Sequence, residues 1–441
     1  MQLSEIVDLL HCTCSRDLLI SGISIDSRSI VPGDLFVAIS GDAFDGHDFV
    51  DDAVTRGAVA VLCSQSTLNL SVPELLVDDT IEALATIATH HRQKLAAQVI
   101  ALTGSNGKTT VKEMIAQILP QPAYATPGNL NNHIGVPLSL LKMTNAHQYA
   151  VFELGANHVG EIAHTVAMVK PQVALINNIA PAHIAEFGSI ENVAKTKGEI
   201  YLGLTKTGIA IVNEDDAYAH FWDDILVDMR VLRFSTKKTA DVYAQDITFN
   251  TEGHAQFTLV TPVGRAQIQL QVAGGHNVSN AVAAAACAHA VNISLEEIIA
   301  GLCRFSGVSG RLHFCIGKQQ AVIIDDTYNA NLRSSLAAVD VLSARAGRRI
   351  LVLGDMGELG DYSQRHHEEI GKVARERGIE RVMTCGDASE YTARAFGALG
   401  QHYANQALLL HDLVADLDST TTVLVKGSRA SKMEQVVAEL L

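Results

Sequence analysis

The sequence lacks the features of a membrane-spanning or secreted protein. No apolar run approaches the roughly 18 residues that a spanning helix needs, and the chain does not open with a basic segment followed by an apolar one. The seven cysteines are odd in number and scattered, which is not the pattern of a disulfide framework. We therefore expect a cytoplasmic protein that is not inserted in a membrane.

Basic residues are also scarce. The 33 Lys and Arg residues are outnumbered by 48 Asp and Glu residues, which gives a net charge of −15, and no long basic patch occurs. These counts argue against a large nucleic-acid-binding surface. Hydrophobic residues make up 48% and charged residues 18% of the chain, as in an ordinary enzyme. We expect a monomer of several domains without a nucleic-acid partner.

The apolar pattern predicts three α/β domains, over residues 1–96, 97–312 and 313–441. The first has short strand-like runs and ends in a helical stretch around 81–94. In the second, apolar strands alternate with helices, which predicts a parallel sheet covered on both faces. An alternating run over 247–272 interrupts this order and predicts a hairpin.

The third segment again alternates strands and helices. Strand-like runs lie at 321–325, 349–353, 381–385 and 422–426, and a glycine follows each of the last three. This order predicts an open, Rossmann-like sheet whose strand ends carry ligand-facing loops.

A glycine-rich run, residues 103–110, joins a strand-like stretch to a helical one. In such a turn, backbone N–H groups and the helix N-terminus bind phosphate. Lys108 can reach the outer phosphates of a nucleoside triphosphate, and the Thr109 hydroxyl can ligate Mg²⁺. The first glycine of the common phosphate-loop pattern is absent, because Leu102 stands in its place. The residues expected to bind the nucleotide are Gly104, Ser105, Asn106, Gly107, Lys108, Thr109 and Thr110.

Polar residues follow two further strands. Glu153 ends the apolar run 150–152, and His183 lies in the loop after 173–176. A carboxylate at a strand end near the phosphate loop is well placed for Mg²⁺. His183 alone is more typical of a structural or exposed residue. The mixed charges around Lys197 predict the solvated start of a helix.

Three later clusters leave alternatives open. Asn277 and Asn280 precede an Ala-rich helix, and capping of that helix is favoured over recognition of an adenine edge. Asp325 and Asp326 follow a strand and suit a ribose diol or a metal ion. The run 426–429 places two cations after a strand, which suits an anion or a basic helix start.

Taken together, these runs resemble the ATP-dependent Mur ligases of peptidoglycan synthesis. The resemblance covers essentially the whole chain, and within the family it is closest to the member that joins D-alanyl-D-alanine to UDP-N-acetylmuramoyl-tripeptide. The runs around Asn131, Glu153 and Asp326 are its most specific parts. The residues that carry it are 26–28, 33–38, 103–109, 129–137, 153–158, 197–200, 325–331, 354–360 and 426–429.

The resemblance implies a role for each domain. The first would bind the UDP of UDP-MurNAc-tripeptide through Ser27 and Arg28, the second ATP and Mg²⁺, and the third the incoming D-Ala-D-Ala. ATP would phosphorylate the tripeptide carboxylate, and the dipeptide amine would attack the acyl phosphate. The family's phosphate loop also lacks the first glycine, so Leu102 fits this pattern.

A carbamylated lysine is also implied by the resemblance. CO₂ would convert Lys197 to a carbamate, whose oxygens suit a hard cation. That group, with Glu153 and His183, would hold a second Mg²⁺, while Thr109 and Glu153 would hold the first. Lys195 is the competing lysine.

Further contacts follow from the same resemblance. Asn280 would contact adenine, Asp326 the ribose, and Arg311 the phosphates. The remaining substrate-binding residues that it implies are Asn131, Asn132, Tyr328, Asn331, Lys426, Ser428 and Arg429.

Three other interpretations stay open at this point. A sibling ligase that adds the third stem-peptide residue would carry an Asp-Asn-Pro-Arg run, which is absent here. Folylpolyglutamate synthetase shares the phosphate-loop core but lacks a comparable UDP-binding first domain. A non-catalytic nucleotide-binding module would not need Glu153, His183 and Lys197 together.

Overall fold

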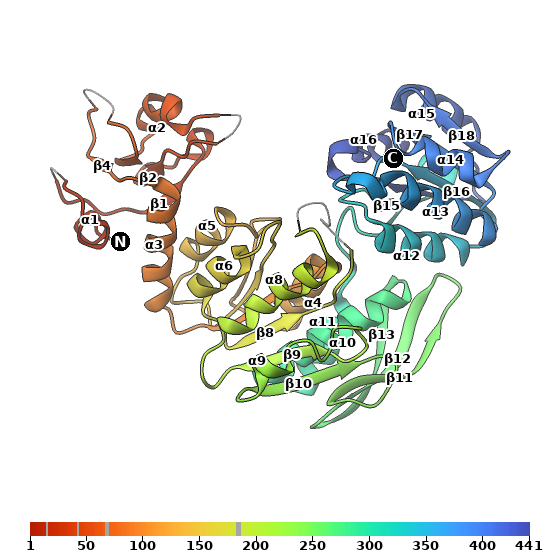
Figure 1. Cartoon of the computed structure of the whole chain (residues 1–441), viewed down its shortest axis with the longest axis horizontal. Coiled ribbons are helices and arrows are strands. Elements are labelled where there is room, and N and C mark those ends of the chain that lie inside the picture. The colour runs from red at the N-terminus through yellow and green to blue at the C-terminus, as the bar shows by residue number, and fades with distance from the viewer. Residues whose placement is uncertain (15, 42–43, 67–69, 182–186) are drawn as a thin grey trace.

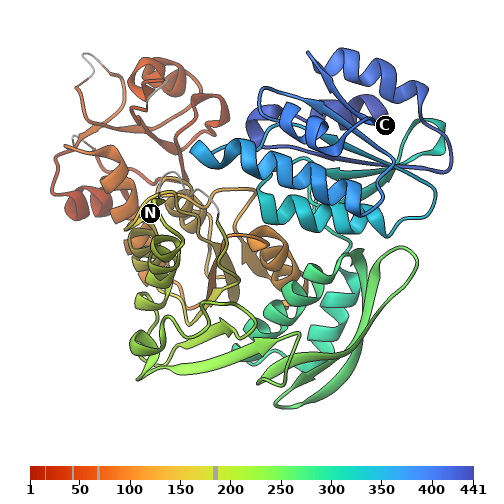
Figure 2. The same ribbon diagram turned by 45° about the vertical axis from the view of Figure 1, so that its right-hand side comes forward.

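Three β-sheets follow one another along the chain. The structure, a computed structural model, describes residues 1–14, 16–41, 44–66, 70–181 and 187–441. In Figure 1 the N-terminal unit (red to orange) and the C-terminal unit (blue) stand apart above the central unit (yellow to green). Figure 2 shows the molecule turned by 45° about the vertical axis. Within the described ranges no helix is long and apolar enough to cross a bilayer. The expected α/β class and the succession of three units are confirmed.

The N-terminal unit is a small parallel sheet with helices on both faces. Its elements are α1 Leu3–Leu10, β1 Gly22–Ser24, η1 Ser27–Ser29, β2 Asp34–Val37, η2 Gly46–Phe49, α2 Val50–Thr55, β3 Ala60–Cys63, β4 Glu74–Leu76 and α3 Thr80–Gln93. The strands run in the order β1-β2-β3-β4. α3 begins behind Asp79, whose carboxylate accepts the N–H groups of Ile81 and Glu82.

The central unit is built on a nine-stranded sheet. Its elements are β5 Gln98–Thr103, α4 Lys108–Ile118, β6 Ala123–Ala125, α5 Gly135–Leu141, β7 Tyr149–Glu153, α6 Glu161–Val169, β8 Val173–Ile176, α8 Ile190–Leu202, β9 Ile209–Asn213, α9 Asp223–Leu226, β10 Arg230–Ser235, β11 Val242–Phe249, β12 His254–Thr261, β13 Gly264–Ala273, α10 Gly275–Ala290 and α11 Leu295–Arg304. The order is β13-β12-β11-β10-β9-β8-β5-β7-β6, and β12 runs antiparallel to both neighbours. One apolar core packs α4, α10 and α11 on the sheet, and the other packs α5, α6 and α8. The carboxyl ends of β5, β7 and β8 therefore share one edge.

The predicted hairpin is confirmed in β12 and β13, but it has a third member. β11 pairs antiparallel with β12, and a register shift between Gln245 and Thr248 interrupts the pairing. Asp246 has a φ of 56° at this bulge. The bulge breaks the alternation of side chains, so the sequence pattern locates the start of the strand too late.

A six-stranded sheet forms the C-terminal unit. Its elements are β14 His313–Ile316, η3 Lys318–Gln320, β15 Val322–Asp326, α12 Leu332–Ser343, β16 Arg348–Leu353, η4 Gly360–Tyr362, α13 Ser363–Glu376, β17 Arg381–Cys385, α14 Glu390–Phe396, β18 Gly400–Tyr403, α15 Gln406–Ala415, β19 Thr421–Lys426, η5 Arg429–Ser431 and α16 Glu434–Leu440. The order is β14-β15-β19-β16-β17-β18, parallel except for β14. Apolar cores on both faces give the open, Rossmann-like sheet that the sequence predicts.

Candidate active site

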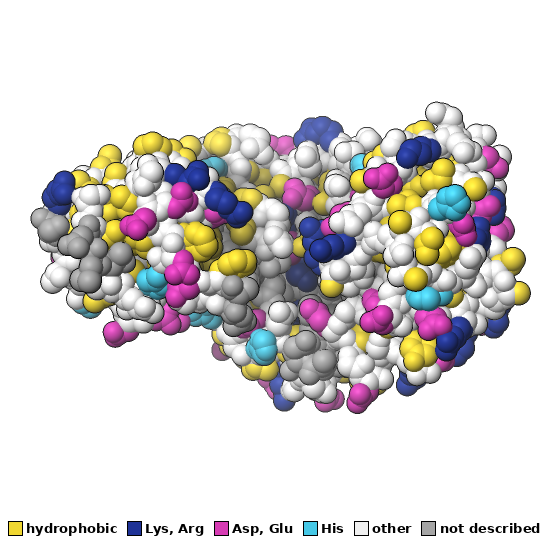
Figure 3. Space-filling model, turned by 90° about the horizontal axis from the view of Figure 1, so that it is seen from above, with side chains coloured by type: hydrophobic (Ala, Val, Ile, Leu, Met, Phe, Trp, Pro, Cys, Tyr) yellow, Lys and Arg dark blue, Asp and Glu magenta, His cyan; other side chains and the backbone are white. Residues whose placement is uncertain are grey.

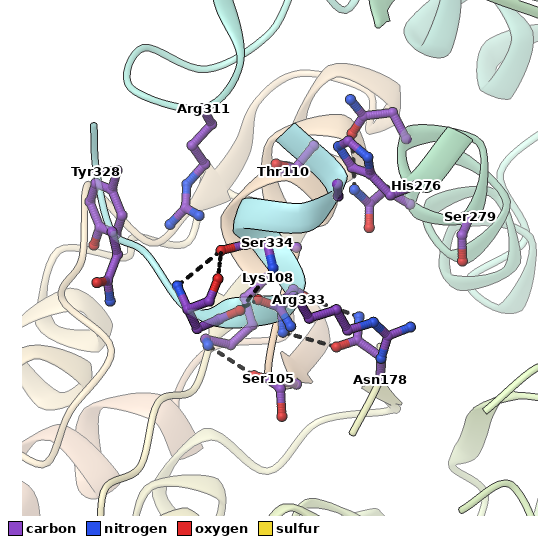
Figure 4. A pocket seen from close by; sticks show the side chains of 18 of the residues that line it. Ser105, Lys108, Thr110, Asn178, His276, Ser279, Arg311, Tyr328, Arg333 and Ser334 are labelled. Carbon is purple, nitrogen blue, oxygen red and sulfur yellow. Dashed lines mark hydrogen bonds between the residues drawn. The ribbon is translucent and has the colours of Figure 1, made fainter. Parts of the chain in front are cut away.

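A cavity of about 590 Å³ lies where the central and C-terminal units face each other. From above, the molecular surface is hollowed between its two ends, and Lys or Arg side chains gather at the hollow (Figure 3). Figure 4 shows Arg311 and Tyr328 on one side of the cavity and His276 and Ser279, from α10, on the other. The cavity therefore combines groups from both sheets.

The phosphate loop forms the floor of this cavity. It leaves β5 at Thr103 and enters α4 at Lys108, as predicted. Gly107 has a φ of 78°, and a Cβ there would come within 2.5 Å of the Asn280 Oδ1 atom, so only glycine fits. Lys108 Nζ donates to the Gly104 carbonyl at 2.9 Å. Burial lowers the pKa of Lys108, the nearby Glu153 carboxylate opposes this shift, and Arg311 adds to it.

A series of buried amides supports the loop from below. Asn106 donates its N–H to Asn178 and accepts at its carbonyl from Asn177 and Asn178. Asn177 also donates to Asn280 at 3.1 Å, and Asn280 donates to Asn277 at 3.0 Å. Both members of the 277/280 pair are buried. These bonds place Asn280 against the phosphate loop and at the cavity lining.

The favoured capping role of Asn277 and Asn280 is wrong. α10 begins at Gly275, its cap is Gly274, and both asparagines lie inside the helix. Gly274 has a φ of 97°, which a residue with a side chain rarely adopts. The Asn277 side chain instead donates to the Ala273 carbonyl.

Glu153 lies at the carboxyl end of β7, beside the phosphate loop. Its side chain is buried and accepts hydrogen bonds at both oxygens, from Thr109 Oγ1 at 2.9 Å and from Asn131 Nδ2 at 2.7 Å. A carboxylate and a hydroxyl in contact are the hard oxygen donors that Mg²⁺ prefers. The donor set at this point fits a magnesium ion next to bound phosphates.

Lys197 is buried inside α8, so its prediction as a solvated residue is wrong. It is 3% exposed and lines the cavity, whereas Lys195 on the same helix is exposed. Burial, with a smaller contribution from the Lys108 charge, lowers the pKa of Lys197 to about 7. Among the described residues its ammonium has no hydrogen-bond or ion-pair partner. Gly198 allows this placement, because a Cβ there would lie 2.4 Å from Trp222 Nε1.

His183, the third expected metal ligand, lies outside the described residues. In the part of the chain that the structure describes, no group of three His, Cys, Asp or Glu side chains converges as a metal site. The expected set of Thr109, Glu153, His183 and modified Lys197 contains only two residues of these types, so it does not require such a group.

The C-terminal unit and the segment that leads into it reach the same site through Asn331 and Arg311, respectively. Arg311 Nη2 donates to Thr109 Oγ1 at 3.0 Å, and its guanidinium lies 4.1 Å from the centre of the Tyr328 ring. Asn331 Nδ2 donates to Asn106 Oδ1 at 2.8 Å. The structure thus brings two of the expected residues, Arg311 and Asn331, into contact with the phosphate loop.

Asp326 and Lys426 are paired with each other. The Lys426 ammonium lies 2.5 Å from the Asp326 carboxylate, and both side chains are buried while lining the cavity. Burial raises the pKa of Asp326, and the Lys426 charge opposes this shift. Lys426 is therefore not a free cation of the kind that the run 426–429 suggests.

Four expected residues lie away from the cavity. Arg28 is exposed and pairs with Asp26, and Ser27 is buried at the start of η1 in the N-terminal unit. Arg429 is exposed and lies 3.4 Å from Glu434. Ser428 is buried against Ser431. Of the expected residues near the loop 126–132, Asn131 and Asn132 do line the cavity.

Several cavity residues were not predicted individually. His276 and Asn178 stand in runs that the sequence marks, directly after a Gly-Gly pair and after β8. Arg333 and Ser334 lie in the first turn of α12, and Arg333 donates to the Ile179 carbonyl at 3.3 Å. Arg333 and Ser334 could have been identified by their position, because they lie in the first turn of a helix that follows a strand-end loop.

Phosphate loop, buried lysine and strand-end carboxylate together define a nucleotide-dependent α/β enzyme of three units. Three family models match this chain: the Mur ligase family, catalytic domain, over residues 19–92; the Mur ligase middle domain, over 102–288; and the Mur ligase, glutamate ligase domain, over 310–429. The chain belongs to the Mur ligase family. The resemblance inferred from the motifs is confirmed.

Individual relatives agree along the full length. UDP-N-acetylmuramoyl-tripeptide–D-alanyl-D-alanine ligase of Escherichia coli (strain K12) is 44% identical over 445 residues, covering 99% of this chain and 98% of the relative. The crystal structure of MurF from Acinetobacter baumannii superposes with a TM-score of 0.91 at 37% identity, covering 99% of this chain and 98% of that one. MurF ligase from Thermotoga maritima in complex with ADP gives a TM-score of 0.83 at 28% identity, with 96% and 97% covered.

Proposed function

We propose that this enzyme joins D-alanyl-D-alanine to UDP-N-acetylmuramoyl-tripeptide, with ATP converted to ADP and phosphate. The observation that carries the proposal is the shared cavity, in which the phosphate loop and Glu153 of one unit face Arg311 and Asp326 of another. A ligase needs such a junction, since the phosphate donor and the attacking amine must reach one carboxylate. Full-length similarity to ligases of this name supports the choice of substrates.

In this proposal the nucleotide lies along the phosphate loop. Backbone N–H groups of 104–110 and the Lys108 ammonium hold the phosphates, and the Thr110 hydroxyl adds a donor at the start of α4. Asn280 approaches the adenine, Asp326 the ribose, and Arg311 the outer phosphates. Arg311 now contacts Thr109, so we expect it to exchange this bond for a phosphate oxygen.

Two Mg²⁺ ions complete the proposed site. Thr109 and Glu153 would hold one, and Glu153, His183 and carbamylated Lys197 the other. Bound Mg²⁺ would neutralise the charge shared by the triphosphate and the acceptor carboxylate.

The carbamate itself follows from the chemistry of Lys197. The neutral Nζ attacks the carbon of CO₂, an N–C bond forms, and the nitrogen releases a proton to solvent. The lowered pKa of about 7 supports this step, because much of the amine is then neutral near neutral pH. The product is a carbamate whose single negative charge is shared by two oxygens, in place of the amine.

The units then divide the two substrates. We propose that the N-terminal unit binds the UDP group at Ser27 and Arg28, and that Asn131 and Asn132 guide the peptide toward Glu153. The acceptor carboxylate attacks the γ-phosphorus, ADP leaves, and the amine of D-Ala-D-Ala then attacks the acyl carbon and displaces phosphate. The amine side would be bound by the C-terminal unit, with the proposed contacts Tyr328, Asn331, Lys426, Ser428 and Arg429. Closure of the cavity would keep water from the acyl phosphate.

We further propose that the enzyme works as a monomer in the cytoplasm, where ATP is available. Sedimentation velocity tests the first point, and a dimer at assay concentration would contradict it.

Phosphate release tests the activity directly. With ATP, Mg²⁺ and UDP-MurNAc-tripeptide, we expect release that depends on D-Ala-D-Ala, and we expect Lys108→Ala to lose it. Phosphate release that does not depend on the dipeptide, or that requires the third amino acid of the stem peptide instead, would contradict the proposal.

A second experiment tests the carbamate. Lys197→Ala should nearly abolish turnover, and acetate should partly restore it by supplying a carboxylate in the vacated space. Lys195→Ala, on the exposed face of the same helix, is the matched control and should behave like the parent enzyme.

A further inference from the structure

Lys112 is a buried lysine that the proposed chemistry does not use. It lies on α4, one turn beyond Lys108, and its side chain is fully buried. Its ammonium donates to the Thr126 carbonyl at 2.7 Å and to the Gly128 carbonyl at 3.4 Å, and lies 2.8 Å from Glu113 Oε1. The three donors of the ammonium thus have three oxygen partners, as a buried charge requires.

The loop that Lys112 holds is the one that orients Glu153. Thr126 Oγ1 accepts the Glu153 backbone N–H at 3.1 Å, and the Thr126 N–H donates to Val151. Further along the same loop, Asn131 donates its side chain to Glu153 Oε1 and accepts the Gly155 N–H at its carbonyl. The loop 126–131 therefore sets both the backbone and one carboxylate oxygen of Glu153.

The other carboxylate oxygen is set by the helix that carries Lys112. Thr109, on α4, donates to Glu153 Oε2 at 2.9 Å. The two groups that orient Glu153 thus come from separate segments, the helix and the loop. Lys112 connects these segments directly, because its backbone belongs to the helix while its ammonium binds loop carbonyls.

We infer that Lys112 is a positioning residue for Glu153: it fixes the loop 126–131 relative to α4, so that Asn131 and Thr109 present the carboxylate to a metal ion in one orientation. The inference rests on the proposed role of Glu153 as a Mg²⁺ ligand. Hydrogen-bond partners of metal ligands commonly change affinity by about 10- to 100-fold when removed.

Metal affinity, measured without turnover, tests the inference. Mn²⁺ is titrated into the full-length enzyme with the non-hydrolysable adenylyl imidodiphosphate, and free Mn²⁺ is followed by electron paramagnetic resonance. We expect Lys112→Met to weaken Mn²⁺ binding about tenfold. Lys112→Gln, which keeps a shorter donor, should weaken it less. The kcat/KM for ATP at saturating Mg²⁺ should change less than the Mg²⁺ dependence.

Two controls separate positioning from simple destabilisation. Ile115→Ala removes a fully buried side chain from the same helix, so it should lower the melting temperature without changing Mn²⁺ affinity. Glu113→Gln removes the ion pair but leaves the carbonyl bonds of Lys112, and should also preserve affinity.

Two outcomes for the Lys112 variants would contradict the positioning role. Unchanged Mn²⁺ affinity in folded Lys112→Met overturns the inference, and so does failure of both Lys112 variants to fold, which would assign the residue to the folding core. Glu153→Gln is measured in parallel. If it binds Mn²⁺ like the parent enzyme, the proposed metal site fails; if it loses Mn²⁺ while Lys112→Met does not, only the positioning role fails.

Discussion

The central unit meets its two neighbours through very different junctions. Toward the N-terminal unit the contact is an extension of the apolar core: Ala85 and Ala88 of α3 belong to the central core, and Leu138 of α5 packs on the N-terminal one. Toward the C-terminal unit, Ala273 and, just before β14, Leu312 are the described residues from outside that unit in or against its apolar core. That junction is carried by side-chain hydrogen bonds around a cavity.

A single buried arginine reinforces the first junction. Arg92, near the end of α3, donates to the carbonyls of Val169 and Lys170 at the end of α6 and to those of Leu95 and Ala97 in the connecting segment. Four backbone acceptors on both sides of the connection hold it in one conformation. The N-terminal unit is therefore placed before any ligand binds.

At the second junction, the bonds use groups that the reaction also needs. Arg311 holds Thr109, and Asn331 holds Asn106, so both bonds end on the phosphate loop. A nucleotide at that loop must compete with them or replace them. The comparison indicates that the N-terminal unit, proposed to bind the acceptor, is fixed on the central unit. The C-terminal unit, proposed to bind the amine, is positioned by the ligand at the phosphate loop.

The largest test of this comparison removes Arg311 from the second junction. Arg311→Ala should lower turnover about 100-fold, since a donor aimed at developing charge in a closed site is worth that much. Its melting temperature should stay near that of the parent enzyme, because the residue is not in an apolar core. Steady-state phosphate release and calorimetry measure the two quantities.

The matched control is Arg377→Ala, which removes an exposed arginine paired with Asp340 on the same unit. Turnover of this variant should be unchanged. If Arg311→Ala lost stability but kept its turnover, the second junction would be structural and the contrast between the two junctions would fail.

Removing the arginine from the first junction should do the opposite. Arg92→Met leaves buried carbonyls without donors and should lower the free energy of unfolding by about 3 kcal/mol. Urea unfolding followed by the fluorescence of Trp222, the one tryptophan of the chain, reports on the core that α3 shares. Turnover without urea should change less than twofold.

Arg56→Met provides the comparison for this variant, since it breaks an exposed pair with Asp52. Its urea midpoint should not move. If Arg92→Met lost turnover as strongly as Arg311→Ala, the first junction would belong to the chemistry and the contrast would fail.

The pH dependence of Lys197 gives the next effect. With a pKa of about 7 instead of the ordinary 10.5, its neutral fraction rises about tenfold between pH 6 and 8 and then levels off. Burial favours the neutral amine. Below about pH 7 the amine is charged in both the folded and the unfolded chain, so the full cost of burying the charge opposes folding. Between about pH 7 and 10.5 this cost falls, and the free energy of unfolding rises with pH.

Carbamylation at fixed dissolved CO₂ measures this fraction. We expect its initial rate, followed by ¹³C NMR, to rise about tenfold from pH 6 to 8 and to approach a plateau. An ordinary lysine would rise about 100-fold over the same range without a plateau. A rise of about 100-fold without a plateau would show that the Lys197 amine is not buried.

Local patterns predict the site where its groups follow one another closely along the chain. The phosphate loop, its strand and its helix lie within one short segment, and Glu153 ends a strand whose neighbours in the sheet are set by the α/β order. The helical period also identifies the buried face of α4, including Met114 and Ile115.

Burial and pairing between distant segments could not be predicted in the same way. Lys195 and Lys197 stand on one helix in the same mixed-charge run. Lys197 shares the buried face of α8 with apolar residues such as Val193 and Tyr201, but the cavity that this face lines is formed by distant segments. Lys426 meets Asp326 because β19 lies beside β15, a register that sequence spacing does not contain. Likewise, Gly274 caps α10 with a positive φ, and the asparagines that follow it in the sequence are themselves typical capping residues.

The smallest test concerns the Asn331–Asn106 bond at the second junction. Asn331 also caps α12, because its side-chain oxygen accepts the Ser334 N–H. Asn331→Ser keeps an oxygen that can cap α12, but its side chain is too short to reach Asn106 Oδ1, so the contact between units is lost. We expect the ligand-free enzyme to open, with a larger radius of gyration in small-angle X-ray scattering. The KM for ATP should change about two- to tenfold, since one hydrogen bond contributes about 0.5–1.5 kcal/mol. Asn405→Ser, at the cap of α15 away from the cavity, makes the same chemical change without touching a neighbouring unit. If both variants scatter like the parent enzyme, the second junction does not depend on this bond, and the bonds of Arg311 and Arg333 must hold it.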